Sequence, residues 1–286
     1  MKYVKIILFG LLCFLVLFPI IFTITNSFSD HSSILDMYGA VLMNSDEEDI
    51  ARYGEYVSLN MFPGDSSMEQ YKTALWYRMD AMNAFWNSVK YTVTIVFFQV
   101  IISAMAAYGY ARLKFRFRNV LYFISIVIMI MPQQVTLVPN FYVLNKFGWL
   151  DSALAVTIPA IFSTFGVFLL TQYMKDISPD ISEAARIDGA GEWKIFTKII
   201  LPQAKGAVAA LVLLSFVENW NMVEAPLVFL KDRTLFPLSI LLNTDSAASL
   251  GTAFAIGTVF MLFPLILFLL FEDDLVESIG YTNITM

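Results

Sequence analysis

Residues 175–202 read KDISPDISEAARIDGAGEWKIFTKIILP, a polar segment between two long apolar ones. Ser178 can cap a helix that begins at Pro179, because the missing N–H of a proline costs nothing in the first turn. Ala184 and Ala185 present little side chain, so the surface of another protein can approach this helix closely. The first half of the segment therefore predicts a short helix suited to protein contact.

The second half of this segment predicts a turn followed by another helix. Gly189 and Gly191 permit a backbone turn. A second short helix is expected over residues 192–200. We expect it to stop before Pro202, because a proline ring disfavours helical geometry at the preceding residue. The segment thus predicts two short helices joined by a glycine turn.

Six apolar blocks make up most of the remaining chain. Each is close to the roughly 20 residues that a helix needs to cross a hydrocarbon core. They cover residues 6–25, 87–110, 120–142, 153–174, 206–230 and 252–271. We therefore predict an all-α integral membrane protein with six transmembrane helices, in which residues 175–202 join the fourth span to the fifth.

The composition agrees with a membrane protein. Of the 286 residues, 58% are hydrophobic and 15% are charged, whereas soluble proteins carry about 25% charged residues. This excludes an ordinary water-soluble enzyme. The net charge of −6 argues against nucleic acid as a partner, because phosphate binding needs clustered Lys and Arg. Cys13 is the single cysteine, so no intrachain disulfide and no cysteine-based metal site can form.

The distribution of positive charge indicates the orientation, because Lys and Arg in short loops resist transfer across the membrane. With the N-terminus inside, the cytoplasmic side receives Lys2, Lys5, Arg112, Lys114, Arg116, Arg118, Lys175, Arg186, Lys194, Lys198 and Lys205. The short outer loops then hold only Lys146, Lys231 and Arg233. The tail after the last span is acidic, but acidic residues contribute little to the rule. We predict that both termini are cytoplasmic.

These blocks divide the chain into four parts. They are residues 1–25 (N-terminus and first span), 26–83 (an acidic outer segment), 84–272 (the remaining spans, with the loop at 175–205) and 273–286 (a cytoplasmic tail). The first span is too long for a signal peptide and no small-residue cleavage site follows it, so we expect a retained helix. The outer segment has a turn at residues 63–67 with short helices on either side. It reads either as a solvated loop or as a small cap that meets an external partner.

The spacing within residues 175–202 carries a resemblance to a known family. The order Glu183-Ala184-Ala185, three residues, Gly189, nine residues, Ile199, one residue and Leu201-Pro202 resembles, at every fixed position, the signature loop of permease subunits of ATP-binding-cassette (ABC) importers. The surrounding residues are similar to the carbohydrate branch, the maltose-type inner-membrane permeases. Further similarity lies at Asn87-Ser88, Ala106 to Arg112, Met131-Pro132, Trp220-Asn221 and Pro226-Leu227. Residues 26–83 match no part of the family pattern, and the tail lacks the basic, Gly-rich ending common in the branch.

The resemblance implies a type I ABC importer fold in the bacterial cytoplasmic (inner) membrane, with a coupling helix between spans four and five. It implies a permease that imports a sugar or oligosaccharide by alternating access. The residues that it assigns to ATPase coupling are Glu183, Ala184, Ala185, Gly189, Ile199, Leu201 and Pro202. The plain alternative is an amphipathic juxtamembrane helix without a partner.

The resemblance also implies a set of partners. They are a homologous second permease, two copies of a cytoplasmic ATPase, an extracellular solute-binding protein and membrane lipid. No Gly-x-x-x-x-Gly-Lys-Ser/Thr sequence occurs in the chain, so the phosphate-cradling loop of an ATPase is missing. We therefore expect no cofactor in this chain, with ATP and Mg²⁺ bound by the partner ATPase.

Polar groups within the spans are the candidate pathway residues, because they are costly in lipid. Trp220, Asn221 and Glu224 are expected on one side of the fifth span, with Pro226 as a kink. An indole face can stack on a sugar ring while Asn and Glu hydrogen-bond its hydroxyls. Gln133 in the third span is a further candidate. Helix packing is the plain alternative for all of them, and Glu224 departs from the family, where this position is usually apolar.

Two rival functions stay open at this point. An importer of another organic solute, such as a polyol, glycerol phosphate or a peptide, would share these features, although no Lys or Arg lies deep in the spans to hold an anionic solute. An ATP-independent channel or carrier would use Glu218 or Glu224 as proton-linked groups, but it does not explain residues 175–202. A membrane enzyme is set aside, because no Ser-His-Asp or metal-ligand constellation is present and His31 is the only histidine. The basic residues 112–118 determine topology and face anionic lipid.

Overall fold

A computed structural model describes residues 2–42, 66–244 and 250–282. Within these residues the chain is helical, apart from turns and one isolated bridge between Ser29 and Ser66, which confirms the all-α prediction. Residues 63–65 of the predicted outer turn lie outside the described residues, as do the acidic residues 46–55 and the end of the tail. The chain divides into two compact units, residues 1–85 with 240–263 and residues 86–239 with 264–286.

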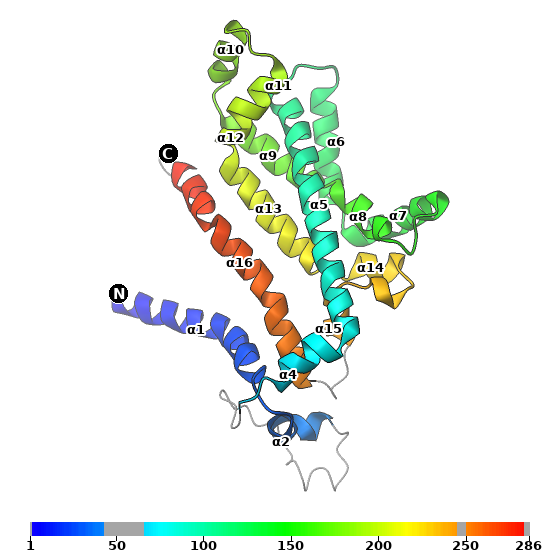
Figure 1. Cartoon of the computed structure of the whole chain (residues 1–286). Helices are drawn as coiled ribbons and strands as arrows, with labels where there is room; N and C mark the ends of the chain where they lie inside the picture. The colour runs from blue at the N-terminus through cyan, green and yellow to red at the C-terminus, as the bar shows by residue number, and fades with distance from the viewer. Residues whose placement is uncertain (1, 43–65, 245–249, 283–286) are drawn as a thin grey trace. The chain divides into compact units, whose positions relative to one another are not determined.

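The helices are labelled in Figure 1. They are α1 (Lys2–Asn26), α2 (His31–Leu42), α4 (Glu69–Lys72), the π turn η1 (Thr73–Tyr77), α5 (Met79–Arg112), α6 (Arg118–Ile130), α7 (Gln133–Phe147), α8 (Ala153–Ile161), α9 (Thr164–Asp176), α10 (Pro179–Ile187), α11 (Glu192–Ile195), the π turn η2 (Phe196–Ile200), α12 (Leu201–Gln203), α13 (Lys205–Trp220), α14 (Glu224–Phe229), the 3-10 turn η3 (Arg233–Leu235), α15 (Leu238–Thr244) and α16 (Leu250–Thr282).

Four helical segments of the described chain are long and apolar enough to span a membrane. They are Tyr3–Asn26, Met79–Arg112, Ala153–Asp176 and Leu250–Asp273. Two further segments are bent pairs, α6 with α7 and residues 192–203 with α13. The described chain thus has six spans if each bent pair counts as one, and four if neither does.

The third predicted span is not one straight helix. The α6 helix ends at Ile130, and α7 starts at Gln133 after a bend of 105°. Met131 between them is extended, with ψ 132°, a conformation that the ring of Pro132 favours at the preceding residue. Figure 1 shows α7 turning away from the direction of α6. Hydropathy alone cannot distinguish such a broken segment from a straight one.

The fifth predicted span is also interrupted. The α13 helix ends at Trp220, and a new short helix, α14, begins at Glu224. Pro226 therefore lies in the first turns of α14 rather than at a kink in a continuous helix. The prediction that Trp220, Asn221 and Glu224 share one side of one helix is wrong for this reason.

The core of the unit formed by residues 86–239 joins α5, α9, α10 and α13 with the segment 192–203. Its buried residues include Tyr108, Leu170, Met174, Ala185, Ile195, Phe196, Ile200 and Leu211. Close approach between these helices depends on small side chains, which is the usual way of packing helices in lipid. A Cβ atom on Gly166 of α9 would lie 2.6 Å from Ser103 Oγ of α5 and 3.1 Å from Leu211 Cδ1 of α13. Gly166 and Ser103 are therefore small residues that let α9 approach α5 closely.

In the other unit, the end of the outer segment packs against the start of α16. The Thr252 hydroxyl donates to Gln70 Oε1 at 3.1 Å, and a Cβ atom on Gly251 would lie 2.6 Å from Gln70 Nε2. The Ser27 and Tyr71 hydroxyls form a hydrogen bond of 2.7 Å. In sequence, the short helices α2 and α4 lie on either side of residues 43–65, which are outside the described chain.

Candidate functional site

The α10 helix is stabilised at its start by its own sequence. The Ser178 Oγ accepts a hydrogen bond from the Asp180 N–H at 3.3 Å, and Pro179 occupies the first position of the helix. Such a cap typically stabilises a helix by about 1 kcal/mol. The predicted cap and helix start are confirmed.

The end of α10 is closed by a left-handed glycine. Gly189 has φ +80°, its N–H donates to the Arg186 carbonyl at 3.0 Å, and the Ala190 N–H donates to the Ala185 carbonyl at 2.9 Å. These two hydrogen bonds form a Schellman motif, in which the glycine takes the conformation that a Cβ atom disfavours. The predicted turn therefore has a defined geometry that favours glycine at position 189 but not at 191, where φ is −72°.

The two faces of α10 differ in burial. Ser182 and Ala185 are buried, with Ala185 in the core cluster of this unit. Glu183 and Ala184 are exposed, and so are Ile187 (86%) and, on α11, Trp193 (66%). We call these four exposed residues the outward face. The two alanines therefore have different roles. Ala184 adds little bulk to the outward face, whereas the small side chain of Ala185 lets α10 pack closely against its own chain.

The second helix continues further than the sequence predicted. A π turn over residues 196–200 widens the backbone, so that the Leu201 N–H donates to the Phe196 carbonyl. Pro202 then follows the π turn as the second residue of α12, and the helix ends at Gln203. The prediction that it stops before Pro202 is wrong. Ile199 and Leu201 are half-buried against the core cluster, and Pro202 is exposed.

A hydrogen-bonded link joins both short helices to the end of α5. The Tyr108 hydroxyl donates to Glu192 Oε2 at 2.5 Å, and Arg186 Nε donates to Glu192 Oε1 at 2.7 Å. The Glu192 carboxylate raises the pKa of Arg186 above its usual value, mainly through this hydrogen bond. We call Tyr108, Glu192 and Arg186 the carboxylate link.

Arg112 fixes the same end of α5 to the end of α9. One of its terminal nitrogens donates to the carbonyls of Met174 (2.8 Å) and Ile177 (2.5 Å). Figure 1 shows α10 and α11 at the end of the unit where α5 ends and α6 begins. The sequence interpretation missed the Tyr108–Glu192 bond and this contact, because their partners lie 62 to 84 residues apart and no local pattern connects them.

The candidate pathway residues lie around the two helix breaks. Trp220 is 1% exposed and its ring stacks on Phe216, with 5.3 Å between the ring centroids. Asn221 is exposed, and its side chain donates to the Val217 carbonyl at 2.8 Å. Glu224 is exposed as well, as is Gln133 at the start of α7. The structure therefore buries the indole and leaves the other three side chains accessible.

A hydrogen bond connects the segments that follow the two breaks. Gln134 Nε2 on α7 donates to both carboxylate oxygens of Glu224 on α14, at 2.9 and 3.1 Å. Leu144, Ala155 and Phe229 form a small buried cluster of α7, α8 and α14. Glu224 thus has a partner within the chain, which the sequence did not identify.

Asp151 fixes the turn before α8 to the segment after α14. Its Oδ1 accepts from the N–H groups of Lys231 (2.8 Å) and Asp232 (2.9 Å), and its own N–H donates to the Phe229 carbonyl at 2.9 Å. The hydrogen bonds from Asp232 and then Lys231 lower the pKa of Asp151 below its usual value. Among the described residues, no group of three or more His, Cys, Asp or Glu could hold a metal ion.

The chain matches one protein family over most of its helical region. Residues 99–277 match the family described as "Binding-protein-dependent transport system inner membrane component". A solved structure of a bacterial ABC transporter involved in the import of the acidic polysaccharide alginate has a chain with the same fold. Its TM-score is 0.73 and its identity 23%, and the match covers 93% of this chain and 94% of that one.

Curated relatives carry transport names. The arabinooligosaccharides transport system permease protein AraQ of Halalkalibacterium halodurans is 32% identical over 190 residues, which are 65% of this chain and 68% of the relative. The lactose transport system permease protein LacG of Rhizobium radiobacter is 28% identical over 193 residues (66% and 70%). The sn-glycerol-3-phosphate transport system permease protein UgpE of Brucella abortus is 28% identical over 180 residues (61% and 64%).

Proposed function

Because this chain belongs to the family of inner membrane components of binding-protein-dependent transport systems, we propose that it is the permease subunit of an ATP-driven importer of a sugar or oligosaccharide. The chain moves its solute across the cytoplasmic membrane by alternating access. Residues 178–202 couple it to a separate ATPase. The observation that carries the coupling role is the outward face of α10 and α11.

The outward face has the properties of a protein contact. Ile187 is 86% exposed and Trp193 is 66% exposed, although both belong to a polar connection between spans, where large apolar side chains exposed together mark an interaction site. Ala184, one turn before Ile187 on α10, adds little bulk to the face, and the exposed Glu183 adds a charge. A groove of an ATPase can enclose a short helix of this kind, with the apolar residues at the centre of the contact.

The contacts on the buried side of α10 can transmit a displacement of this helix to the spans. Its buried side packs in the core cluster, the carboxylate link attaches it to α5, and Arg112 attaches α5 to the end of α9. When closure of the ATPase pair displaces α10, the ends of α5 and α9 move with it. The helices then pass from an inward-facing to an outward-facing arrangement, a rigid-body transition of the kind that packed helices support.

The proposal includes the partners and the orientation. A homologous second permease completes the pathway, two ATPase copies bind ATP and Mg²⁺, and an extracellular solute-binding protein delivers the solute. No Gly-x-x-x-x-Gly-Lys-Ser/Thr sequence occurs in this chain, so hydrolysis belongs to the partner. Both termini and α10 lie on the cytoplasmic side, which the gathering of Lys and Arg in the corresponding loops supports.

A sugar is the substrate class that the relatives favour. The relatives named for arabinooligosaccharides and lactose support a neutral glycoside. The relative named for sn-glycerol-3-phosphate keeps another organic solute as the second candidate. An anionic solute would need Lys or Arg in the pathway, and the predicted spans carry neither deep within them, so we take the neutral glycoside.

The pathway residues proposed for this solute are Gln133, Asn221 and Glu224. All three are exposed and lie at helix breaks, and broken helices in a membrane are tolerated where they line a cavity. Gln134 holds the Glu224 carboxylate in place. Trp220 supports this region by packing against Phe216 rather than by touching the solute.

Co-purification tests the function directly. The full chain is tagged, extracted gently from its own membrane with and without trapped nucleotide, and its companions are identified by mass spectrometry. We expect a second permease and an ATPase with a phosphate-binding loop in stoichiometric amounts. If the chain comes out alone, under conditions that preserve a control importer, the importer proposal fails and an ATP-independent carrier takes its place.

A matched pair of variants tests the outward face. Ala184→Trp adds bulk to it, and Ala153→Trp adds the same bulk at the exposed first residue of α8. Overpacking a close contact costs about 1–3 kcal/mol, so Ala184→Trp should lower ATPase recovery about tenfold or more at unchanged chain level. Ala153→Trp should recover the ATPase as the wild type does. Equal recovery with both variants would place the ATPase contact elsewhere.

A further inference from the structure

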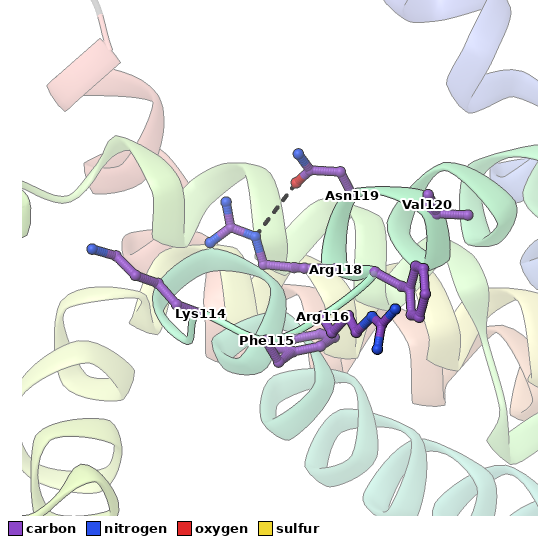
Figure 2. Close-up of a pocket in the computed structure, with 7 residues that line it drawn as sticks. Lys114, Phe115, Arg116, Arg118, Asn119 and Val120 are labelled. Carbon is purple, nitrogen blue, oxygen red and sulfur yellow. Dashed lines mark hydrogen bonds between the residues drawn. The ribbon is translucent and has the colours of Figure 1, made fainter.

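The connection between α5 and α6 forms a hollow of about 550 Å³, lined by the consecutive residues 114–120. Figure 2 shows the side chains around it. Lys114, Arg116 and Arg118 supply three positive charges, and no lining residue is acidic. We call it the basic hollow.

The three cations of the basic hollow are not neutralised. In the described parts of the chain, none of them forms an ion pair with a carboxylate. Arg118 donates instead to the Leu113 carbonyl (3.1 Å) and to Asn119 Oδ1 (3.4 Å). The Arg116 guanidinium carbon lies 4.9 Å from the centroid of the Phe117 ring. These contacts orient the guanidinium groups and leave their charge available to an anion.

The basic hollow adjoins apolar and aromatic surface. Phe115 is 43% exposed and Phe117 61% exposed, and the exposed surface of α6 continues with Val120 at 54%. The Tyr110 and Tyr122 rings, on the adjoining ends of α5 and α6, lie 5.3 Å apart. Because the hollow connects the ends of two apolar helices, these rings stand where a membrane meets water, the position that aromatic side chains prefer.

The turn between α5 and α6 contains a residue with an unfavourable backbone conformation. Phe117 has φ +65°, a left-handed conformation that is unfavourable for a bulky residue. Strained residues of this kind cluster at binding sites, because the surroundings fix them in a conformation that the chain alone would not choose. Here the strained turn holds the Phe117 ring against the Arg116 guanidinium.

We propose that the basic hollow binds the phosphate group of one anionic phospholipid. Arg116 and Arg118 contact the phosphate, since a guanidinium fork matches phosphate oxygens, and Lys114 adds a third charge. Phe115 and Phe117 lie against the glycerol and the first acyl carbons. A soluble phosphate offers the same anion chemistry, but it has no apolar part that could pack against the Phe115 and Phe117 rings. This proposal goes beyond the coupling role and does not depend on it.

Photo-crosslinking tests the proposal. The full chain, with the subunits that co-purify with it, is placed in nanodiscs of phosphatidylcholine that contain photoreactive phosphatidylglycerol or photoreactive phosphatidylcholine. The labelled fraction of the peptide around residues 113–122 is measured by mass spectrometry. Because each cation near a membrane surface adds to the attraction for anionic lipid, we expect the anionic probe to label this peptide about tenfold more than the neutral one.

Charge variants separate the basic hollow from general attraction. The triple variant Lys114→Gln, Arg116→Gln and Arg118→Gln should lose most of the anionic labelling. The matched triple variant Lys146→Gln, Lys231→Gln and Arg233→Gln removes the same charge elsewhere and should keep it. A variant with Arg116→Lys and Arg118→Lys should keep part of it, because the charge remains without the guanidinium fork.

Three results would overturn the proposal. The first is equal labelling of the wild-type chain by the anionic and the neutral probe. This result needs no variant and therefore stands even if the triple variant fails to fold. The second is complete competition by inorganic phosphate at constant ionic strength, which would assign the hollow to a soluble anion. The third is unchanged labelling in the first triple variant together with loss of its ATPase, which would make the hollow a protein-docking surface.

Discussion

Gly189 ends α10 in a conformation that few other residues adopt. Its φ of +80° and the two hydrogen bonds around it set the angle at which the chain leaves α10 for α11. A Cβ atom would meet no other atom within 4 Å, so any penalty for a larger residue at this position comes from the backbone alone. This makes the position a clean test of conformational strain.

Gly189→Ala should weaken the end of α10 by about 1 kcal/mol, which corresponds to roughly fivefold faster amide exchange over residues 186–191. Gly189→Asn should cost less, because Asn tolerates the left-handed region. Hydrogen exchange followed by mass spectrometry measures both. Gly191→Ala is the control, since Gly191 has φ −72° and the same open surroundings. Equal exchange in the two alanine variants would contradict the assignment of strain to Gly189.

Asp151 makes the loop that follows α14 sensitive to acid. Hydrogen bonds from two backbone N–H groups lower its pKa, so the carboxylate form stabilises the folded loop. That stabilisation is complete above the ordinary pKa of an aspartate, about 3.9, and is lost as the pH falls through the lowered value. We expect amide protection of Lys231 and Asp232, corrected for intrinsic exchange, to fall in this acidic range.

The Asp151→Asn variant is the control for this effect. An Asn keeps an amide oxygen as acceptor and tolerates the φ of +58° found at Asp151, but it does not titrate. Its protection should therefore be independent of pH over the same range. A wild type that behaves like Asp151→Asn would show that the carboxylate does not hold the loop.

Local chemistry decided which residues could be predicted. Ser178 and Gly189 act on their own neighbours in sequence, so capping and turn rules identified them. Ala184 and Ala185 are neighbouring residues of the same type, so the sequence does not distinguish them. Only the packing of α10 against the neighbouring helices shows that Ala184 is exposed and Ala185 is buried. Glu192 was likewise read only as the start of a helix, because its partner Tyr108 comes from another element.

At the scale of elements, helix packing depends on Gly166. Gly166→Ala places a Cβ atom against Ser103 and Leu211 and should destabilise the α5–α9–α13 contact by about 1–3 kcal/mol. Ser103→Ala in the same chain should restore part of the loss, since it removes the nearest atom. The midpoint of thermal unfolding in detergent measures this.

Gly109→Ala is the matched control for Gly166→Ala. Gly109 lies on α5 as Ser103 does, and a Cβ atom there would meet nothing within 4 Å. The variant should therefore keep or raise the midpoint, because alanine favours a helix over glycine by about 1 kcal/mol. If both alanine variants lower the midpoint equally, close packing at Gly166 is not the cause.

The breaks in the spans mark the limit of prediction at this scale. Hydropathy identified the apolar blocks correctly, since total apolar length is a property of composition. It could not predict the direction of the chain after Met131, where the ring of Pro132 favours an extended residue, or the end of α13 at Trp220. The candidate pathway residues fall at these breaks, so their arrangement was the part of the site predicted least well.

At the scale of the whole molecule, coupling requires that movement of a surface helix reach the spans. The carboxylate link is the polar part of that connection, because Glu192 receives hydrogen bonds from Tyr108 on α5 and Arg186 on α10. The hydrogen bond from the buried Tyr108 hydroxyl to this carboxylate contributes about 1.5 kcal/mol, whereas the exposed Arg186–Glu192 pair adds at most about 1 kcal/mol. The apolar core cluster behind it keeps α10 folded when the link is absent, so the link can be removed without unfolding the site.

Tyr108→Phe and Glu192→Ala should therefore uncouple the assembled transporter rather than prevent its assembly. We expect solute transport in proteoliposomes to fall about fivefold or more, with ATPase recovery unchanged and hydrolysis continuing without transport. The double variant should be no worse than Glu192→Ala alone, because Glu192→Ala already removes the hydrogen bond to Tyr108. Tyr110→Phe, two residues further along α5, should transport as the wild type does. Additive losses in the double variant, or hydrolysis that falls in proportion to transport, would mean that these residues act separately and that α10 moves the spans through its apolar contacts alone.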